Sequence, residues 1–487
     1  MKKTLCILLA LMCLLSLGGM NAHAQAADTS VAYLPLLPGS GHLLNAHGQF
    51  EARQAFMRML PGLVEAQASG QIVRFSPDLA DGLALVEYPT GTDLSGLVQN
   101  GLPVIDSTEA MQGFIRSQSV QATQGLRDIP EAQGLGDPSI DLQPYSSCFS
   151  LYNLGANKTY SAYLWDTRGK LVAGLKGTLD ASGSGGDCLL SGFTSGLLSG
   201  SNNGMVPGFI FNLLQYDSTH TILENTYTTK IPTIEVSNYT TAQHIARGKA
   251  PVGSQLNLTL AHFQMDAGDS IVVTLKNPTT NGQGVWQADF SPSGMRGGDM
   301  LSMLWAKPAT LFVFHRVLSV PFVSCILDSN FCIVFGGKAG TPADITALHG
   351  GVNYKASGYF DSNGVFSATL YNNKAVPLNL AKGDLISGSA LTTLALPNLT
   401  AFFNYGTSIM SGKTPPNNGR YYAVSVLQQT SANYTNWSVW THANTAGNYT
   451  ADFSGDGPFT GDFLRLQVDF VDYATGNQTI YYSAVAP

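Results

Sequence analysis

The stretch GVWQADF (Gly284–Phe290) decides the fold, because GVFSATL (Gly364–Leu370) and GNYTADF (Gly447–Phe453) repeat its pattern. Side chains alternate between the two faces of a strand, so each stretch places large, small and large apolar residues on one face. Polar residues occupy the other face, as in a half-buried antiparallel strand. The small central alanine leaves room for a side chain from a facing sheet, which favours a β-sandwich. The leading glycine is expected to end a turn with positive φ.

Two further markers accompany this strand in constant order, which indicates an internal repeat. A Gly-Lys pair precedes the strand and a Gly-Asp pair follows it, at Gly248, Gly337 and Gly412 and at Gly298, Gly383 and Gly461. The opening glycines lie 80 and 83 residues apart. Strands of about 5–8 residues over such a period give about seven strands per repeat, which fits an immunoglobulin-like sandwich. Each aspartate of the Gly-Asp pair is expected to accept a hydrogen bond from a nearby amide.

Residues 28–110 show a different pattern, which predicts a small ferredoxin-like domain of order β-α-β-β-α-β. Its predicted elements are a strand at 31–37, a helix over 50–67, two strands split by Pro77–Gly82, a short helix capped by Asp93, and a strand at 102–106. Pro61 and Gly62 should kink or break the first helix. The predicted fold class is therefore mainly β, with tandem antiparallel β-sandwich (Ig-like) domains preceded by this α+β domain.

The predicted segments follow from these patterns and from composition. They are a signal peptide (1–24), the α+β domain (28–110), a linker (111–140), a diverged first sandwich (141–228) and three sandwich repeats (229–320, 321–403 and 404–487). The first segment has a basic start, a short apolar run and an A-x-A site, so cleavage is predicted after Ala24 and the location is secreted or cell-surface. No later segment approaches the ~20 apolar residues of a membrane span.

Charge excludes one class of partner. Only 12% of the residues are charged and the formal net charge is −7. Nucleic-acid binding needs a basic face that neutralises phosphates, so it is not expected. The expected partners are an extracellular protein or a polysaccharide.

Four cysteines remain after removal of the signal peptide, and export favours disulfides. Cys325 and Cys332 flank a hairpin-like segment, which leaves Cys148 to pair with Cys188, although four cysteines allow three pairings. A zinc site made of all four thiolates lacks a C-x-x-C pair. No cofactor is expected, although a calcium site at Asp456 and Asp462 stays an alternative.

Catalytic motifs are missing from the sequence, so no enzyme activity is predicted. There is no G-x-S-x-G elbow and no H-E-x-x-H helix. His315 is expected to face solvent from a strand. The candidate ligand contacts are Trp437, Trp440 and His442, because aromatic faces stack on sugars and the two tryptophans, three residues apart, lie on opposite strand faces. A hydrolase without a recognisable motif stays a third alternative.

Two segments of the chain resemble known families. Residues 140–487 resemble the tandem Ig-like and carboxypeptidase-regulatory-like repeats of bacterial surface proteins, which implies sandwich folds and no active site. The α+β segment, with its strands GLALVEY and LPVID, is similar to the propeptide or inhibitor domain of subtilisin-type proteases, although no protease motif follows. The predicted function is a non-enzymatic structural or adhesive scaffold or spacer. The alternative is an extracellular binding module that recognises a glycan or a protease through the first domain or one sandwich.

Overall fold

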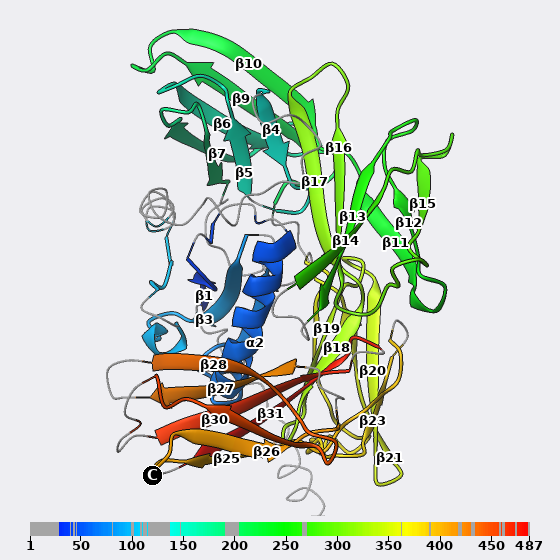
Figure 1. The fold of residues 1–487 in the computed structure, drawn as a ribbon. Coiled ribbons are helices and arrows are strands. Elements are labelled where there is room, and N and C mark those ends of the chain that lie inside the picture. The colour runs from blue at the N-terminus through cyan, green and yellow to red at the C-terminus, as the bar shows by residue number, and fades with distance from the viewer. Residues whose placement is uncertain are drawn as a thin grey trace, which may run out of the picture.

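The computed structural model describes residues 29–485 apart from residues 115–136, residues 190–203 and several shorter gaps. The predicted signal peptide and most of the predicted linker lie outside the described residues. Strands dominate the described chain, beside the helix α2 (Ala46–Ala68) and the 3-10 turns η1 (Ser95–Leu97) and η2 (Thr241–Gln243). The mainly β fold class is therefore confirmed (Figure 1). No helix of the described part is long and apolar enough to cross a membrane.

From β4 onward the described strands form four successive units. Unit 1 contains β4 (Ser139–Leu142), β5 (Cys148–Tyr152), β6 (Thr159–Trp165), β7 (Leu171–Thr178), β8 (Gly185–Cys188), β9 (Ile210–Tyr216) and β10 (Leu223–Lys230). Unit 2 contains β11 (Glu235–Thr240), β12 (Ile245–Lys249), β13 (Asn257–Gln264), β14 (Ser270–Lys276), β15 (Val285–Asp289), β16 (Met300–Ala306) and β17 (Phe312–Ser319).

The last two units follow the same plan. Unit 3 contains β18 (Phe322–Ile326), β19 (Phe331–Phe335), β20 (Pro342–His349), β21 (Val352–Tyr359), β22 (Phe366–Thr369), β23 (Leu385–Ser387) and β24 (Leu394–Ala395). Unit 4 contains β25 (Thr400–Asn404), β26 (Ile409–Lys413), β27 (Tyr421–Gln429), β28 (Tyr434–His442), β29 (Asn448–Asp452), β30 (Phe463–Val471) and β31 (Gln478–Val485). In every unit the first, second and fifth strands form one layer, and the fourth, third, sixth and seventh form the other. This is an immunoglobulin-like sandwich.

The units are joined in pairs by strand pairing. The first strand of unit 1, β4, pairs in parallel with the last strand of unit 2, β17, so their layers form one seven-stranded sheet. Units 3 and 4 repeat this joint through β18 and β31. Each joint gives two edge strands a partner, and exposed edges are otherwise sites of unwanted pairing. The four units are thus two double modules and not four separately linked domains.

The repeated strand motif of GVWQADF and its two copies lies as predicted. Trp286, Phe366 and Tyr449 are all buried and belong to the sandwich cores. The glycines before them have φ angles of 71°, 72° and 77°. Each ends a turn that starts with Asn281, Asp361 or Asn444, whose side-chain oxygen accepts hydrogen bonds from the amides two and four residues later. A left-handed glycine suits such a tight turn, which here leads from the fourth strand in one layer to the fifth strand in the other.

The Gly-Lys marker marks a close approach between strands. A Cβ on Gly248 would lie 1.9 Å from the carbonyl oxygen of Glu235 and 2.4 Å from the Trp286 ring. Gly412 is crowded in the same way by Thr400 and Tyr449, and Gly337 by the Phe360 ring. At Gly248 and Gly412 the glycine therefore makes room for the aromatic side chain of the neighbouring strand, and at Gly337 for the Phe360 ring that follows β21.

The variant Gly248→Ala is expected to lose about 1–3 kcal/mol of unfolding free energy, because the added methyl group must displace backbone or the indole ring. Chemical denaturation of the full chain measures this loss. Gly282→Ala is the control, since nothing lies within 4 Å of its added Cβ. Equal stability of the two variants would contradict the steric explanation.

The Gly-Asp marker forms the predicted hydrogen bond. Asp299 accepts from the Arg296 amide at 2.9 Å, and Asp384 accepts from the Ala381 amide at 2.9 Å. Each carboxylate also contacts a histidine of the third strand of its unit, His262 or His349. The third copy, Asp462, lies outside the described residues.

The N-terminal domain has the ferredoxin-like strand order with a shortened second half. Strands β1 (Thr29–Pro35), β3 (Leu83–Pro89) and β2 (Arg74–Asp78) form an antiparallel sheet in that order. The predicted strand at 102–106 is reduced to a single bridge between Ile105 and Tyr33. The predicted second helix is only the turn η1, although Asp93 does accept a hydrogen bond from the Ser95 amide at 2.8 Å.

The predicted break at Pro61 is wrong, because α2 continues through it to Ala68. An internal proline removes one helical hydrogen bond and costs about 3 kcal/mol. The helix survives because it is buried between two apolar layers, in one core cluster with its own sheet and with strands of units 3 and 4. Tertiary packing here outweighs local preference.

This domain lies between the two double modules (Figure 1). One face of its sheet, with Val31, Tyr33 and Leu85, packs against the disulfide Cys148–Cys188 of unit 1. The other face packs on α2, and α2 packs in turn on the outer face of β18, β19 and β31. Both faces of a three-stranded sheet are thus buried, which accounts for its nearly continuous apolar strands.

Polar contacts fasten the domain on several sides. The Arg53 guanidinium donates to the Gly298 carbonyl at 2.5 Å, and Ser146 donates to both oxygens of Asp81 at 3.0 Å. Ser76 donates to the Asp361 carboxylate. Burial raises the pKa of Asp361 to about 6. Buried polar groups need such partners, so the contacts fix one orientation of the domain.

Candidate binding face

The predicted disulfides are both present, since Cys148 bonds Cys188 and Cys325 bonds Cys332. Within the described residues, one cluster has metal-ligand spacing, formed by Asp81 and the first cysteine pair. Its sulfurs are consumed by the disulfide, and Asp81 already accepts from Ser146. It is therefore not a metal site. Calcium binding at Asp456 and Asp462 stays a prediction.

Of the candidate ligand contacts near the C-terminus, only Trp437 and His442 have described side chains, so the group of three stays a prediction. Trp437 is half-buried and its ring lies 5.0 Å from the Phe459 ring at the edge of the unit 4 core. His442 is exposed at the end of β28. Trp440 is a β28 residue whose side chain lies outside the described set. Trp437 thus contributes to packing.

The prediction that His315 faces solvent is wrong. His315 is buried, its Nε2 lies 2.7 Å from the Ser302 hydroxyl, and burial lowers its pKa to about 4. The reason is that α2 lies against β16, so the outer face of this sheet is covered and not free. A serine beside a histidine is the start of a nucleophilic dyad, but both residues of this pair are buried, at 4% and 2% exposure.

A buried carboxyl, Asp141, is the second group with chemical potential. It lies on β4, one of its oxygens has no hydrogen-bond partner, and burial raises its pKa to about 7. Perturbed carboxyls often mark functional sites. Here the carboxyl is buried where β4 pairs with β17, opposite Val313, so we interpret it as a polar group enclosed at this joint.

Asp141 makes a pH effect testable. The folded chain keeps its proton between the ordinary pKa of 3.8 and about 7, whereas the unfolded chain releases it. Asp141 therefore favours folding at low pH, and this contribution falls as pH rises through about 7. In melting curves from pH 5 to 8, Asp141→Asn should lose less stability on alkalinisation than the wild type. If the melting temperatures of the two proteins fall in parallel with pH, Asp141 does not have a raised pKa. The titration of buried His315 acts in the opposite direction but is the same in both proteins, so it does not affect the difference.

A cavity of about 60 Å³ lies where the N-terminal domain meets units 1, 2 and 3. Asp78, Gln143 and Arg316 contribute polar groups to its lining. Arg316 is held by the Ile234 carbonyl at 2.9 Å and lies 4.4 Å from the Tyr145 ring centre. This volume suits a few water molecules. The Ser146 hydroxyl in its lining is already donated to the Asp81 carboxylate, a contact that holds the N-terminal domain against unit 1.

Aromatic side chains also lie on the outer face of unit 1. We call the outer face of its four-stranded layer the open face. Strand pairing arranges its residues in four rows across β10, β9, β6 and β7. The first row is Lys230, Ile210, Trp165 and Leu171, and the second is Thr228, Asn212, Tyr163 and Gly174. The third is Thr226, Leu214, Ser161 and Lys176, and the fourth is Leu223, Tyr216, Thr159 and Thr178. The alternate residues of the same strands, such as Phe211 and Leu164, belong to the core.

The open face combines half-buried rings with hydroxyl and amide groups. Trp165 and Tyr163 follow each other on the same face of β6, and Trp165 is flanked by Leu171 and Ile210, which are 45% and 38% exposed. The Tyr163 ring lies over Gly174, where a Cβ would come within 2.9 Å of it. None of the row residues is acidic.

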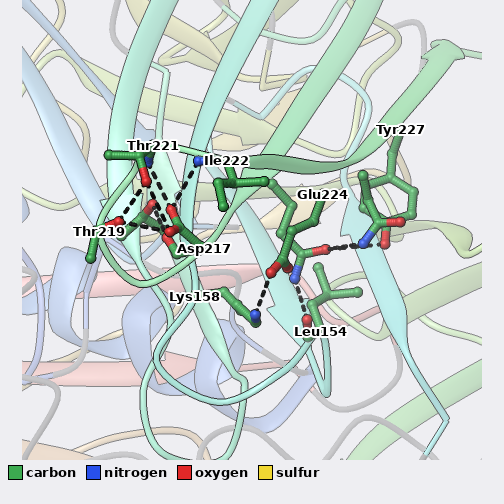
Figure 2. Close-up of polar contacts among 11 residues, drawn as sticks. Leu154, Lys158, Asp217, Thr219, Thr221, Ile222, Glu224 and Tyr227 are labelled. Carbon is green, nitrogen blue, oxygen red and sulfur yellow. Dashed lines mark hydrogen bonds and ion pairs between the residues drawn. The ribbon is translucent and has the colours of Figure 1, made fainter.

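A polar turn supports the far end of the open face, as Figure 2 shows. Asp217 accepts hydrogen bonds from the Thr221 amide at 2.7 Å, the Ile222 amide at 3.1 Å and the hydroxyl of Thr219 at 2.7 Å. These bonds hold the pKa of Asp217 well below its usual range, the Thr219 bond contributing most. The turn carries His220 to a position 4.1 Å from the Tyr216 ring.

The corresponding layers of the other units differ. In units 2 and 4 part of this layer is covered, as buried His315 and buried Gln467, which donates to the Met57 carbonyl, indicate; in unit 2 the edge strand β14 still exposes Leu275. In unit 3 it is exposed but carries Leu348 opposite Leu385, with Tyr359 at its far end. Adjacent aromatic residues on an exposed outer layer are therefore, in the described chain, a feature of unit 1.

Comparisons with known proteins identify no family. No family model and no curated protein matches the chain. The solved structures found include a tetra-tandem repeat from the extending region of a large adhesion protein (16% identity, 72% of this chain and 99% of that one, TM-score 0.14). The BSP domain of a biofilm-associated protein (8%, 72% and 96%, TM-score 0.14) and the FN1–FN3 domains of chicken CNTN1 (8%, 72% and 98%, TM-score 0.15) are others. Such low TM-scores carry no functional argument.

Proposed function

We propose that the protein is an exported, non-enzymatic scaffold that attaches to extracellular material through the open face of unit 1. The observation that carries this proposal is that this aromatic face is exposed, whereas the units and the N-terminal domain are joined to one another by strand pairing and buried contacts. Two parallel strand joints and a central domain buried on both faces support a single rigid particle. The two disulfides suit an oxidising location outside the cytoplasm.

Attachment is tested by coating a surface with the full chain and measuring retention of cells and of isolated extracellular matrix. The proposal expects retention above that of an albumin-coated surface, and a lower level for the double variant Trp165→Ala/Tyr163→Ala. A protein that retains neither material, or retains them equally well without these rings, would not be an adhesive scaffold of this kind.

The inhibitor alternative for the N-terminal domain stays a prediction. Both faces of its sheet are occupied by the rest of the chain, so binding a protease through them requires the domain to leave its place. The full chain is therefore expected not to slow a subtilisin-type protease at micromolar concentration in a peptide-hydrolysis assay.

A further inference from the structure

We propose that the open face binds a neutral polysaccharide chain, whose sugar rings stack on Trp165 and Tyr163. This inference rests on the proposed function, because it names the ligand class of the same face. Sugar rings present apolar C–H faces and polar hydroxyl edges, so their receptors need flat rings surrounded by hydrogen-bonding groups. The open face offers both.

The two rings are placed for successive stacking. Trp165 and Tyr163 are two residues apart on β6, which separates them by about 6.6 Å along the strand and keeps them on one face. Gly174 lies beside Tyr163 in the neighbouring strand, and its missing side chain leaves the place that the phenol ring occupies. A glycine inside a strand weakens it and often marks a close approach by a ligand or another backbone.

Hydrogen-bonding groups stand next to the rings. Thr228 donates to the Asn212 side-chain oxygen at 2.8 Å, in the row that contains Tyr163. This bond orients the Asn212 amide, whose two N–H groups remain as donors for a hydroxyl-rich ligand. A chain lying along β6 would then reach the Tyr216–His220 pair at the other end, where the Thr159 hydroxyl lies 2.8 Å from His220 Nδ1.

Charge and composition favour this ligand over other macromolecules. The rows contain two lysines at their margins, Lys176 and Lys230, and no acid, which is too little positive charge for a nucleic-acid site. A protein interface has a contiguous apolar centre. Here the Thr228 hydroxyl and the Asn212 amide lie between the apolar first row and the apolar residues Leu214 and Leu223 further along, so the apolar surface is interrupted.

The experiment is affinity electrophoresis of the full chain in gels containing soluble cellulose derivatives, xylan, mixed-linkage glucan or alginate. We expect retardation by at least one neutral polysaccharide and a smaller effect of the acidic alginate. Trp165→Ala should weaken binding about tenfold or more, as expected for an aromatic residue at the centre of a contact. Tyr163→Phe, which keeps the ring, should bind like the wild type.

Two further variants make the test decisive. Tyr359→Ala removes an aromatic ring that is 70% exposed on unit 3 and should leave retardation unchanged. Leu171→Glu places a charge beside Trp165 at an exposed position, so it should abolish binding even if Trp165→Ala proves unstable. No retardation in any gel, or equal retardation of all variants, overturns the inference.

The surface-coating experiment separates this inference from the proposed function. Attachment that depends on Trp165 but resists competition by every polysaccharide identifies a protein ligand and overturns only the glycan assignment. Failure of both experiments overturns the proposed function itself.

Discussion

A chain in which Phe56 is replaced by alanine is expected to lose about 3–5 kcal/mol of unfolding free energy. Phe56 is completely buried in α2, and its ring lies 6.2 Å from Phe75 of its own sheet and 6.4 Å from Phe335 of unit 3. The truncation therefore leaves a cavity between the N-terminal domain and the layer that covers it. Denaturant unfolding followed by circular dichroism measures the loss.

The matched control lies on the same helix. Glu51 is exposed, so Glu51→Ala should change the unfolding free energy by no more than about 0.5 kcal/mol. Dye binding to exposed apolar surface should rise for Phe56→Ala before global unfolding, because the outer face of β18 and β19 is uncovered first. If the two variants are equally stable, α2 does not carry the contact described.

Removing the disulfide between Cys148 and Cys188 is expected to lower the unfolding free energy by about 4 kcal/mol. The reason is that the bond closes a loop of 40 residues in the unfolded chain and so reduces the entropy of that state. Replacement by two alanines keeps the site apolar against Val31 and Tyr33, with which the cysteines share a core cluster. The loss should appear as a lower denaturant midpoint. Reduction of the wild type, which breaks both disulfides, should lower the midpoint further than this variant.

The second disulfide is the control for this prediction. Cys325 and Cys332 are 7 residues apart, so the same reasoning gives only about 2.5 kcal/mol for the corresponding double alanine variant. A larger loss at the short closure than at the long one would show that local packing, and not chain entropy, sets the contribution of these bonds.

The sandwich units could be predicted from sequence because their signals are local. Alternation around Trp286 and the turn before Gly284 depend on neighbouring residues, and both lie as expected. The parallel joints between units could not be predicted in this way. They pair strands that lie far apart in the chain, as in the contact between Ile140 and Phe312, and no local pattern specifies that partner.

The sequence contains a sign of where the N-terminal domain packs, which the interpretation of the segment around Cys325 and Cys332 as a simple hairpin missed. The segment Phe322–Phe335 is apolar on both strand faces, unlike GNYTADF, whose outer face is polar. Strands that are apolar on both faces are buried on both faces, so a second layer was implied. Sequence periodicity shows that such a face needs a cover but not which segment provides it.

The open face of unit 1 was missed for a related reason. In TYSAYLW the alternate residues Tyr160, Ala162 and Leu164 fill the core, yet Tyr163 and Trp165 are aromatic as well. Aromatic residues on the expected polar face were the available signal. The choice of Trp437 and Trp440 considered tryptophan spacing alone, and Trp437 packs beside Phe459.

The burial of α2 sets a condition on biogenesis. A ribosome makes α2 early, but the apolar floor beneath it includes Phe322 and Ile480, which are made far later. Domains usually fold as they emerge from the ribosome, which synthesises the chain at about 5–20 residues per second. Here almost the whole chain must be synthesised before the last contact of α2 can form. Nascent and partly exported molecules therefore expose the apolar surface of α2, which is a binding site for a holdase chaperone.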